Sequence, residues 1–342
     1  MNRHNEALRI FAEGTFIPAI PLSLDAQRHF DDAAQRRLVR YYLEAGVGGI
    51  AAAVHTTQFQ IRDPGIALLE PVLRVIGEEI DRFEAESDRV IVRVAGACGP
   101  VEQAVSEAEL ALRLGYDAVL LSPGGLQAAS EENLLERTRA VAEVLPVIGF
   151  YLQPSVGGRM LSYEYWERLC EIGNVIGIKC ASFDRYSTID VVRAAALATR
   201  EVALYTGNDD NIVIDLLTPY QFTVDGETRT KRFAGGLLGH WSVCTRAAVK
   251  IFDELKRAAR KPQVPSRYLR LAAEVTDFNA AVFDAKNGFR GCIPGVHEVL
   301  RRQGLLKGIW CLDPEETLSA GQAAEIDRVM GMYPHLCDEV KR

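Results

Sequence analysis

The stretch Glu171-Ile172-Gly173-Asn174-Val175-Ile176-Gly177-Ile178-Lys179 decides the fold class, because it joins the end of a helix, a turn and a buried strand. The amphipathic pattern of residues 163–172 ends at Gly173, and glycine at this place commonly takes the left-handed conformation that terminates a helix. The apolar run 175–179 has the length and composition of a strand buried on both faces. The stretch therefore predicts a helix that turns directly into a strand of a parallel sheet.

The same helix–glycine–strand unit recurs along the chain at intervals of roughly 30 residues, the size of one βαβ step. It is visible again at Gly46 and Gly115. Apolar runs that fit eight strands lie at residues 15–20, 48–54, 90–95, 118–122, 147–152, 175–179, 202–206 and 233–238. Amphipathic helical patterns lie at 32–45, 102–114, 131–144, 163–172 and 188–199. Eight units favour a closed barrel, and the sequence has no GxGxxG or GxxxxGK[ST] motif, so we predict an α/β fold, a (β/α)₈ TIM barrel.

Two segments lie outside a minimal barrel. Residues 218–233 form a polar stretch with a Val-Asp-Gly-Glu turn signal, which predicts an inserted hairpin over 219–232, away from the active-site face. Its expected role is surface decoration or a subunit contact. Helical patterns continue from residue 242 onward without a change to linker composition. We therefore expect residues 1–241 to form the barrel and residues 242–342 to form a C-terminal helical extension, packed on the barrel as a single structural unit.

Composition and charge narrow the class of function. The net charge of −7 argues against nucleic acid or an anionic membrane as the main partner. No apolar run approaches the roughly 18 residues of a membrane span, and the start of the chain lacks the apolar core of a secretory signal. Seven scattered cysteines without a CxxC pair favour free thiols over disulfides or a zinc site. We expect a cytoplasmic metabolic enzyme.

Lys179 is the residue that points most directly to chemistry. Only eight of the 39 basic residues are lysines, and Lys179 is the first of them, at the end of the sixth apolar run. A lysine buried there needs a partner or loses its proton, and only the neutral amine attacks a carbonyl. Catalytic groups of this fold also lie at the C-terminal ends of the strands. Lys179 is therefore a candidate Schiff-base nucleophile, with a structural ion pair or a side chain reaching the rim as the alternative.

Neighbouring strand ends carry further candidates. Tyr151 ends the fifth run, beside the sixth strand, where a phenol can move protons, or it is a buried aromatic with a polar tip. Thr56 and Thr57 follow the second run, where they can hold a carboxylate or act only as strand formers. His55 can titrate near neutral pH, and it either contacts a substrate hydroxyl or packs against Phe59.

With these strands in place, the chain resembles the dihydrodipicolinate synthase / N-acetylneuraminate lyase family of class I aldolases. The matching segments are Gly-Thr-Phe-Ile-Pro-Ala-Ile-Pro-Leu from residue 14, Thr56-Thr57, Tyr151 with Pro154, Gly177-Ile178-Lys179-Cys180-Ala181-Ser182, and Gly207-Asn208-Asp209-Asp210. The likeness runs in order from about residue 14 to the C-terminal helices.

The resemblance implies a role for each matching residue. Lys179 forms the Schiff base, Tyr151 transfers protons, and Thr56 and Thr57 bind the carboxylate of the keto acid, with Thr57 also in the catalytic set. Further substrate-binding positions are His55, Ser182, Gly207 and Asn208. The family works without a metal or an organic cofactor, on pyruvate or acids that cleave to pyruvate, and usually as a homotetramer or homodimer.

Departures from the family pattern bear on the substrate. His55, Gln58 and Phe59 replace the two glycines and the glutamate of the family's Gly-[Ser/Thr]-Thr-Gly-Glu segment. The stretch 122–125 lacks the tyrosine that the synthase sends into a neighbouring subunit. Val156 stands where the synthase has an arginine, and Arg159 lies three residues further on. We therefore expect an aldolase or dehydratase acting on pyruvate or a related 2-keto acid, and not a true dihydrodipicolinate synthase.

Two other functions remain open from the sequence. One is a metal-dependent barrel lyase, because several oxygen and nitrogen ligands fall at strand ends: His55, Asp184, Asp209, Asp210 and His240. The other is a barrel that binds a keto acid without turnover, since a fold does not determine function.

Overall fold

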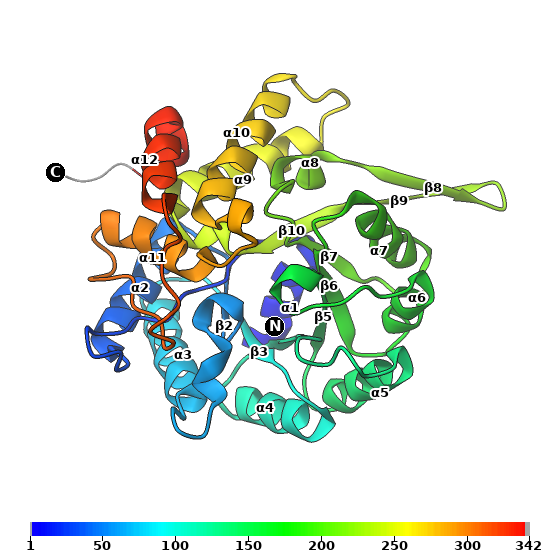
Figure 1. Cartoon of the computed structure of the whole chain (residues 1–342). Coiled ribbons are helices and arrows are strands. Elements are labelled where there is room, and N and C mark those ends of the chain that lie inside the picture. Colours follow the sequence, from blue (N-terminus) through cyan, green and yellow to red (C-terminus); the bar gives the residue numbers. More distant parts are fainter. Residues whose placement is uncertain (1, 339–342) are drawn as a thin grey trace.

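The fold is a barrel of eight parallel strands surrounded by helices, seen down its axis in the computed structural model, which describes residues 2–338 (Figure 1). Its strands are β1 (Phe16–Pro18), β2 (Gly49–Ala52), β3 (Val92–Ala97), β4 (Ala118–Leu121), β5 (Val147–Leu152), β6 (Val175–Ala181), β7 (Ala203–Thr206) and β10 (Phe233–Leu238). They pair in the order β1-β10-β7-β6-β5-β4-β3-β2. A bridge between Ala19 and Ala51 joins β1 to β2 and nearly closes the ring. The predicted (β/α)₈ TIM barrel is confirmed.

The surrounding helices follow the strands in sequence. They are α2 (Asp32–Ala45), α3 (Leu69–Glu86), α4 (Val101–Arg113), α5 (Glu131–Ala142), α6 (Tyr163–Cys170), α7 (Arg185–Leu197) and α8 (Ile212–Leu217). Gly46 and Gly115 have the expected left-handed backbone, with φ of 100° and 75°. Gly173 does not, because α6 already ends at Cys170 and leaves a short turn before β6. The predicted helix end at Gly173 is therefore wrong by about one half-turn.

The strands are buried on both faces, as expected from their continuous apolar runs. One set of side chains fills the barrel interior, including Ile17, Ala51, Val94, Ile148 and Leu237. The other set packs against the helices. Burial on both faces is what a closed parallel sheet requires.

Helix α1 (Arg3–Glu13) closes the N-terminal end of the barrel. Ala7 and Phe11 join the interior cluster, and the Phe11 ring stacks on Tyr205 with the ring centroids 4.3 Å apart. The Tyr205 hydroxyl donates to the Phe11 carbonyl oxygen at 2.7 Å. With this end filled, a ligand reaches the barrel interior from the opposite, C-terminal end of the strands.

The inserted segment forms the predicted hairpin, β8 (Tyr220–Val224) and β9 (Glu227–Lys231), paired antiparallel. Asp225 and Gly226 make the turn with φ of 51° and 83°, the left-handed pair of a tight hairpin turn. The hairpin contacts α7 and then projects away from the barrel (Figure 1).

The C-terminal part is helical, with α9 (Thr245–Ala259), α10 (Arg267–Val282), α11 (Cys292–Arg302) and α12 (Gln322–Met332). Helix α9 contacts α2 and α8, so it completes the ring of helices after β10. Helix α10 packs on α8 and α12 outside that ring. The division into residues 1–241 and 242–342 as a single structural unit stays a prediction.

Two features bear on the expectations from composition. Across residues 2–338 no helix combines the length and hydrophobicity needed to cross a lipid bilayer. All seven cysteines are free thiols, as their scattered spacing predicts.

Candidate active site

A cavity of about 70 Å³ opens at the C-terminal end of the strands. At roughly 10–15 Å³ for each water-sized group, it has room for about five to seven such groups, the size of pyruvate. Its walls are formed by Ala19, Val54, His55, Thr56, Phe150, Leu152, Gln153, Val156, Lys179, Ala181, Phe183, Gly207, Asp209, Gly239, Phe283, Phe289 and Cys292. Apolar side chains surround a few polar groups, which is typical of a small-molecule site.

Lys179 reaches the cavity from the barrel interior. Strand β6 continues to Ala181, so Lys179 is not the last residue of its strand as expected. It lies in register with Phe150 on β5, and its Nζ is 4.5 Å from the centroid of the Phe150 ring. Its methylene chain runs along Gly207, where a Cβ atom would lie 2.7 Å from Lys179 Cε. Gly207 therefore belongs to the site because it leaves room for the lysine.

Asp209 lines the same cavity, and its charge acts on the pKa of Lys179. Burial lowers the pKa of Lys179, and the Asp209 carboxylate opposes part of that shift. Burial likewise raises the pKa of Asp209, and the charge of Lys179 opposes it. The Asp209 carboxylate accepts from the His240 backbone N–H at 3.3 Å, and the Asn279 side chain donates to the Asp209 carbonyl at 2.6 Å. From the sequence, Asp209 was expected only as part of the Gly207–Asp210 turn and as a possible metal ligand.

His55 lines the same cavity and also packs against Phe59, with ring centroids 6.0 Å apart. The packing against Phe59 is therefore observed, and contact of His55 with a substrate stays a prediction. Burial, followed by the positive charge of Lys179, lowers the pKa of His55 to about 4. The imidazole is neutral at pH 7 and is available to exchange a hydrogen bond with a ligand.

Thr56 and Thr57 hold the end of β2 against the segment after β1. The Thr56 hydroxyl donates to the Ala19 carbonyl at 2.7 Å, and the Thr57 hydroxyl donates to the Ile20 carbonyl at 2.8 Å. Thr56 lines the cavity, whereas Thr57 is fully buried behind it. The two hydroxyls thus hold the turn after β2 against the backbone after β1, and Thr56 is the residue of the two that a ligand can reach.

Gln58 replaces a glycine of the family segment and keeps a backbone that glycine favours, with φ of 68°. Its side-chain oxygen accepts from the Leu312 backbone N–H at 2.6 Å. This hydrogen bond from the C-terminal extension therefore helps to hold Gln58 in its strained backbone conformation.

Tyr151 lies away from the cavity. It is in register with Cys180, so it points to the face of β5 opposite Phe150, toward the helices. Its ring stacks on Trp166 with centroids 5.2 Å apart, and its hydroxyl lies 3.4 Å from Met160 Sδ. The structure does not bring Tyr151 together with Lys179, because residues alternate between the two faces of a strand.

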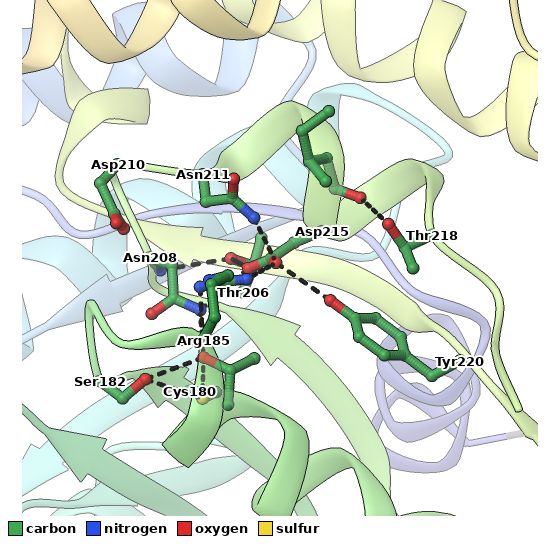
Figure 2. A network of polar contacts seen from close by, with 12 residues as sticks. Cys180, Ser182, Arg185, Thr206, Asn208, Asp210, Asn211, Asp215, Thr218 and Tyr220 are labelled. Carbon is green, nitrogen blue, oxygen red and sulfur yellow. Dashed lines mark hydrogen bonds and ion pairs between the residues drawn. The ribbon is translucent and has the colours of Figure 1, made fainter. Parts of the chain in front are cut away.

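Ser182 and Asn208 belong to a polar network behind the cavity (Figure 2). The Asn208 amide donates to the Asp215 carboxylate at 2.9 Å and accepts from the Phe183 backbone N–H at 3.0 Å. Ser182 donates to the Asp184 carbonyl at 2.9 Å. Neither side chain lines the cavity, so both hold the loops that carry Phe183, Gly207 and Asp209.

Asp215 is the centre of this network and is completely buried. It accepts from the Arg185 guanidinium at 2.6 Å and from the Thr206 hydroxyl at 2.7 Å, in addition to Asn208 (Figure 2). A buried carboxylate with this many donors fixes the ends of β6 and β7 relative to each other.

The possible metal ligands named from the sequence do not converge. Among residues 2–338, no three His, Cys, Asp or Glu side chains are grouped so that they could hold a metal ion.

The sequence is similar to members of one protein family. The model of the dihydrodipicolinate synthetase family matches residues 13–219. The chain is 30% identical over 247 residues to the 4-hydroxy-tetrahydrodipicolinate synthase of Marinobacter nauticus, a match that covers 70% of this chain and 72% of that protein. The same identity over 181 residues relates it to the synthase of Laribacter hongkongensis, covering 52% of this chain and 58% of that protein. An N-acetylneuraminate lyase from Citrobacter koseri is 26% identical over 204 residues, covering 59% of this chain and 64% of that protein.

Solved structures share the fold at lower identity. The dihydrodipicolinate synthase of Oceanobacillus iheyensis superposes with a TM-score of 0.75 at 18% identity, covering 97% of this chain and 99% of that chain. A prophage protein of the dihydrodipicolinic acid synthase family from Escherichia coli K12, solved in complex with pyruvate, superposes with a TM-score of 0.76 at 16% identity, covering 95% and 99%.

Proposed function

The chain belongs to the dihydrodipicolinate synthetase family and is a lyase of the class I aldolase type, and we propose that Lys179 forms its Schiff base with pyruvate or a related 2-keto acid. The observation that carries this proposal is the placement of Lys179. It is a buried lysine with a lowered pKa, in an apolar cavity of pyruvate size at the C-terminal end of a barrel.

The reaction starts from the neutral amine of Lys179, which attacks C2 of the keto acid. Asp209 faces the same cavity, and its raised pKa lets it give a proton to the departing hydroxyl of the carbinolamine. The iminium then withdraws electrons from C3. Loss of a C3 proton, or cleavage of the bond between C3 and C4, yields the enamine.

The assignment of proton transfer to Asp209 replaces the role expected for Tyr151. For Tyr151 to act, its ring would have to leave Trp166 and cross to the inner face of β5. Asp209 needs no such movement. The keto acid carboxylate binds on the side of Thr56 and His55, with Thr57 supporting that turn from behind.

Two positions argue against a true dihydrodipicolinate synthase. Val156 lines the cavity where the synthase has an arginine. Arg159 does not replace that arginine, because its guanidinium donates to the backbone carbonyls of Gln127, at 3.3 Å, and Ala129. The homotetramer or homodimer and the cytoplasmic location expected from the sequence stay predictions.

Borohydride reduction in the presence of pyruvate, followed by peptide mass spectrometry, tests the proposal. We expect a reduced pyruvyl adduct on the Lys179 peptide of the wild type. Lys179→Arg should give no adduct. Lys231→Arg is the control, because Lys231 lies in the hairpin and pairs with Glu201, so its Lys179 peptide should be labelled as in the wild type. A folded wild-type protein that gives no adduct with pyruvate or longer 2-keto acids would refute the Schiff-base chemistry.

A further inference from the structure

Four phenylalanines line the cavity that contains Lys179: Phe150, Phe183, Phe283 and Phe289. Phe183 follows β6, whereas Phe283 and Phe289 come from the C-terminal extension. The rings of Phe183 and Phe289 lie 5.7 Å apart between centroids, tilted by 30°. Phe150 and Phe283 are buried, and Phe183 and Phe289 are partly exposed, so the last two are the rings that a ligand reaches first.

Phe183 and Phe289 both have left-handed backbones, with φ of 50° and 67°, which is rare for a residue with a Cβ atom. Each is held there by a hydrogen bond to its N–H group. Phe183 donates to the Asn208 side chain at 3.0 Å, and Phe289 donates to the Asp284 carbonyl at 3.0 Å. Backbone strain maintained by surrounding bonds is characteristic of functional sites. The backbones that carry the two rings are therefore fixed at the cavity, one after β6 and the other in the C-terminal extension.

The cavity offers no second cation. Among the described residues that line it, Lys179 is the one basic side chain besides the neutral His55. Burial raises the pKa of Cys292, which therefore lines the wall as a neutral thiol.

An outer cleft of about 530 Å³ adjoins the cavity through three shared residues, His55, Val156 and Phe289. Its charged side chains are Arg290, Asp63 and Glu316, two carboxylates against one guanidinium. A substrate with a second carboxylate or a phosphate would find no excess of positive charge in either space.

We propose that the group carried beyond C3 of the keto acid is an uncharged aromatic ring, which packs against Phe183 and Phe289 at the junction of the two cavities. This inference rests on the proposed function and adds the substrate class. Aromatic rings gain from offset or edge contacts at centroid separations of about 4.5–7 Å, a geometry that the Phe183–Phe289 pair already shows. The substrates are then pyruvate with an aryl aldehyde, or the 4-aryl-4-hydroxy-2-keto acid that they form.

The corresponding step is balanced without any further reactant. C3 of the Lys179-bound enamine attacks the aldehyde carbon, the bond between C3 and C4 forms, and the aldehyde oxygen takes one proton. Water then hydrolyses the imine, which releases the keto acid and restores the Lys179 amine. In the reverse direction the hydroxyl loses its proton and the same bond breaks.

The test compares acceptors with the full-length protein and pyruvate, following the aldol products by chromatography. The acceptors are benzaldehyde, cyclohexanecarboxaldehyde of similar size, succinic semialdehyde with a carboxylate, glyceraldehyde with hydroxyls, and acetaldehyde as a small reference. We expect kcat/KM for benzaldehyde to exceed that for succinic semialdehyde and glyceraldehyde at least about tenfold, because the apolar walls leave added polar groups unpaired. It should also exceed that for cyclohexanecarboxaldehyde by roughly two- to tenfold.

Substitutions test whether Phe183 and Phe289 cause the preference for an aromatic aldehyde. Phe183→Leu and Phe289→Leu should each lower the ratio of benzaldehyde to acetaldehyde kcat/KM by roughly two- to tenfold. Phe222→Leu in the projecting hairpin is the matched control and should leave the ratio unchanged. Lys179 trapping with pyruvate, combined with equal or better turnover of the non-aromatic acceptors, overturns the aromatic assignment and leaves the proposed function standing. Absence of trapping refutes the proposed function itself, and the inference with it.

Discussion

Replacing Asp209 by asparagine tests the charge arrangement around Lys179. Burial lowers the pKa of Lys179, and the Asp209 carboxylate is the charge that opposes this shift. Asparagine keeps the size and a hydrogen-bond acceptor for His240 but removes the charge. The pKa of Lys179 should therefore fall further below that of an ordinary lysine.

The expected size follows from the electrostatics of close pairs. An opposite charge within about 4–6 Å shifts a pKa by roughly 1–3 units, and each unit corresponds to about 1.4 kcal/mol. Asp209 is partly open to the cavity, so solvent screens the pair and we expect the lower part of that range, about one unit. Because the neutral amine is the reactive form, the pH midpoint of pyruvate trapping should move downward by this amount in Asp209→Asn. Overall turnover should fall about 10²- to 10⁴-fold, the usual contribution of a proton-transfer group.

The assay is the rate of borohydride trapping measured from pH 5 to 10, together with steady-state turnover. Asp210→Asn is the matched control, because Asp210 is adjacent in sequence but exposed and outside the cavity. Tyr151→Phe separates the two candidate proton donors and should retain most of the turnover. An upward or absent shift in Asp209→Asn, or a loss of turnover confined to Tyr151→Phe, would show that the charge assignment is wrong.

Three further substitutions test single contacts. Gly207→Ala places a Cβ atom 2.7 Å from Lys179 Cε, so pyruvate trapping should drop severely and the free energy of unfolding should fall by about 1–3 kcal/mol. Gly173→Ala is the control, because the added carbon has no atom within 4 Å, and it should change neither trapping nor stability. Val156→Arg should raise kcat/KM for succinic semialdehyde about tenfold by supplying a cation at the cavity, and unchanged acceptor preference would contradict this. Tyr205→Phe removes the hydroxyl that donates to Phe11, so urea denaturation should show a loss of about 1–3 kcal/mol with turnover per folded molecule retained.

The fold was predictable because it repeats. Each unit of the barrel signals its strand by a continuous apolar run and its helix by an amphipathic pattern, so errors at one boundary do not change the architecture. Residues 32–45, 147–152 and 233–238 were predicted with the bounds that the structure has. The helix end at Gly173 was missed because α6 is a short helix and the turn after it is longer than the pattern suggests.

The site was predictable in part. Lys179, His55, Thr56 and Gly207 line the cavity at the C-terminal end of the barrel, although Lys179 lies two residues before the end of its strand. Tyr151 does not line the cavity, because the face of a strand on which a side chain lies depends on the register with the neighbouring strand, and the spacing of residues along the chain does not give that register.

The sequence also could not show which residue of the turn after β7 faces the cavity. Asn208 and Asp209 are adjacent in one turn, and the sequence singled out Asn208 as a binding residue. The structure turns Asn208 toward the buried carboxylate of Asp215 and leaves Asp209 to face the cavity. The choice between the two depends on a partner on α8, and therefore on tertiary structure.

The C-terminal extension supplies part of the cavity wall that the strands do not. The barrel interior is filled by side chains and closed by α1, so the strands that carry Lys179 have little freedom to vary. Phe283, Phe289 and Cys292, by contrast, reach the cavity from the extension, and Asn279 holds the backbone of Asp209. Because the proposed imine-forming Lys179 lies on a strand, whereas Phe289 of the proposed aldehyde site lies on the extension, we expect changes in the extension to alter the aldehyde that is accepted while the chemistry at Lys179 stays the same.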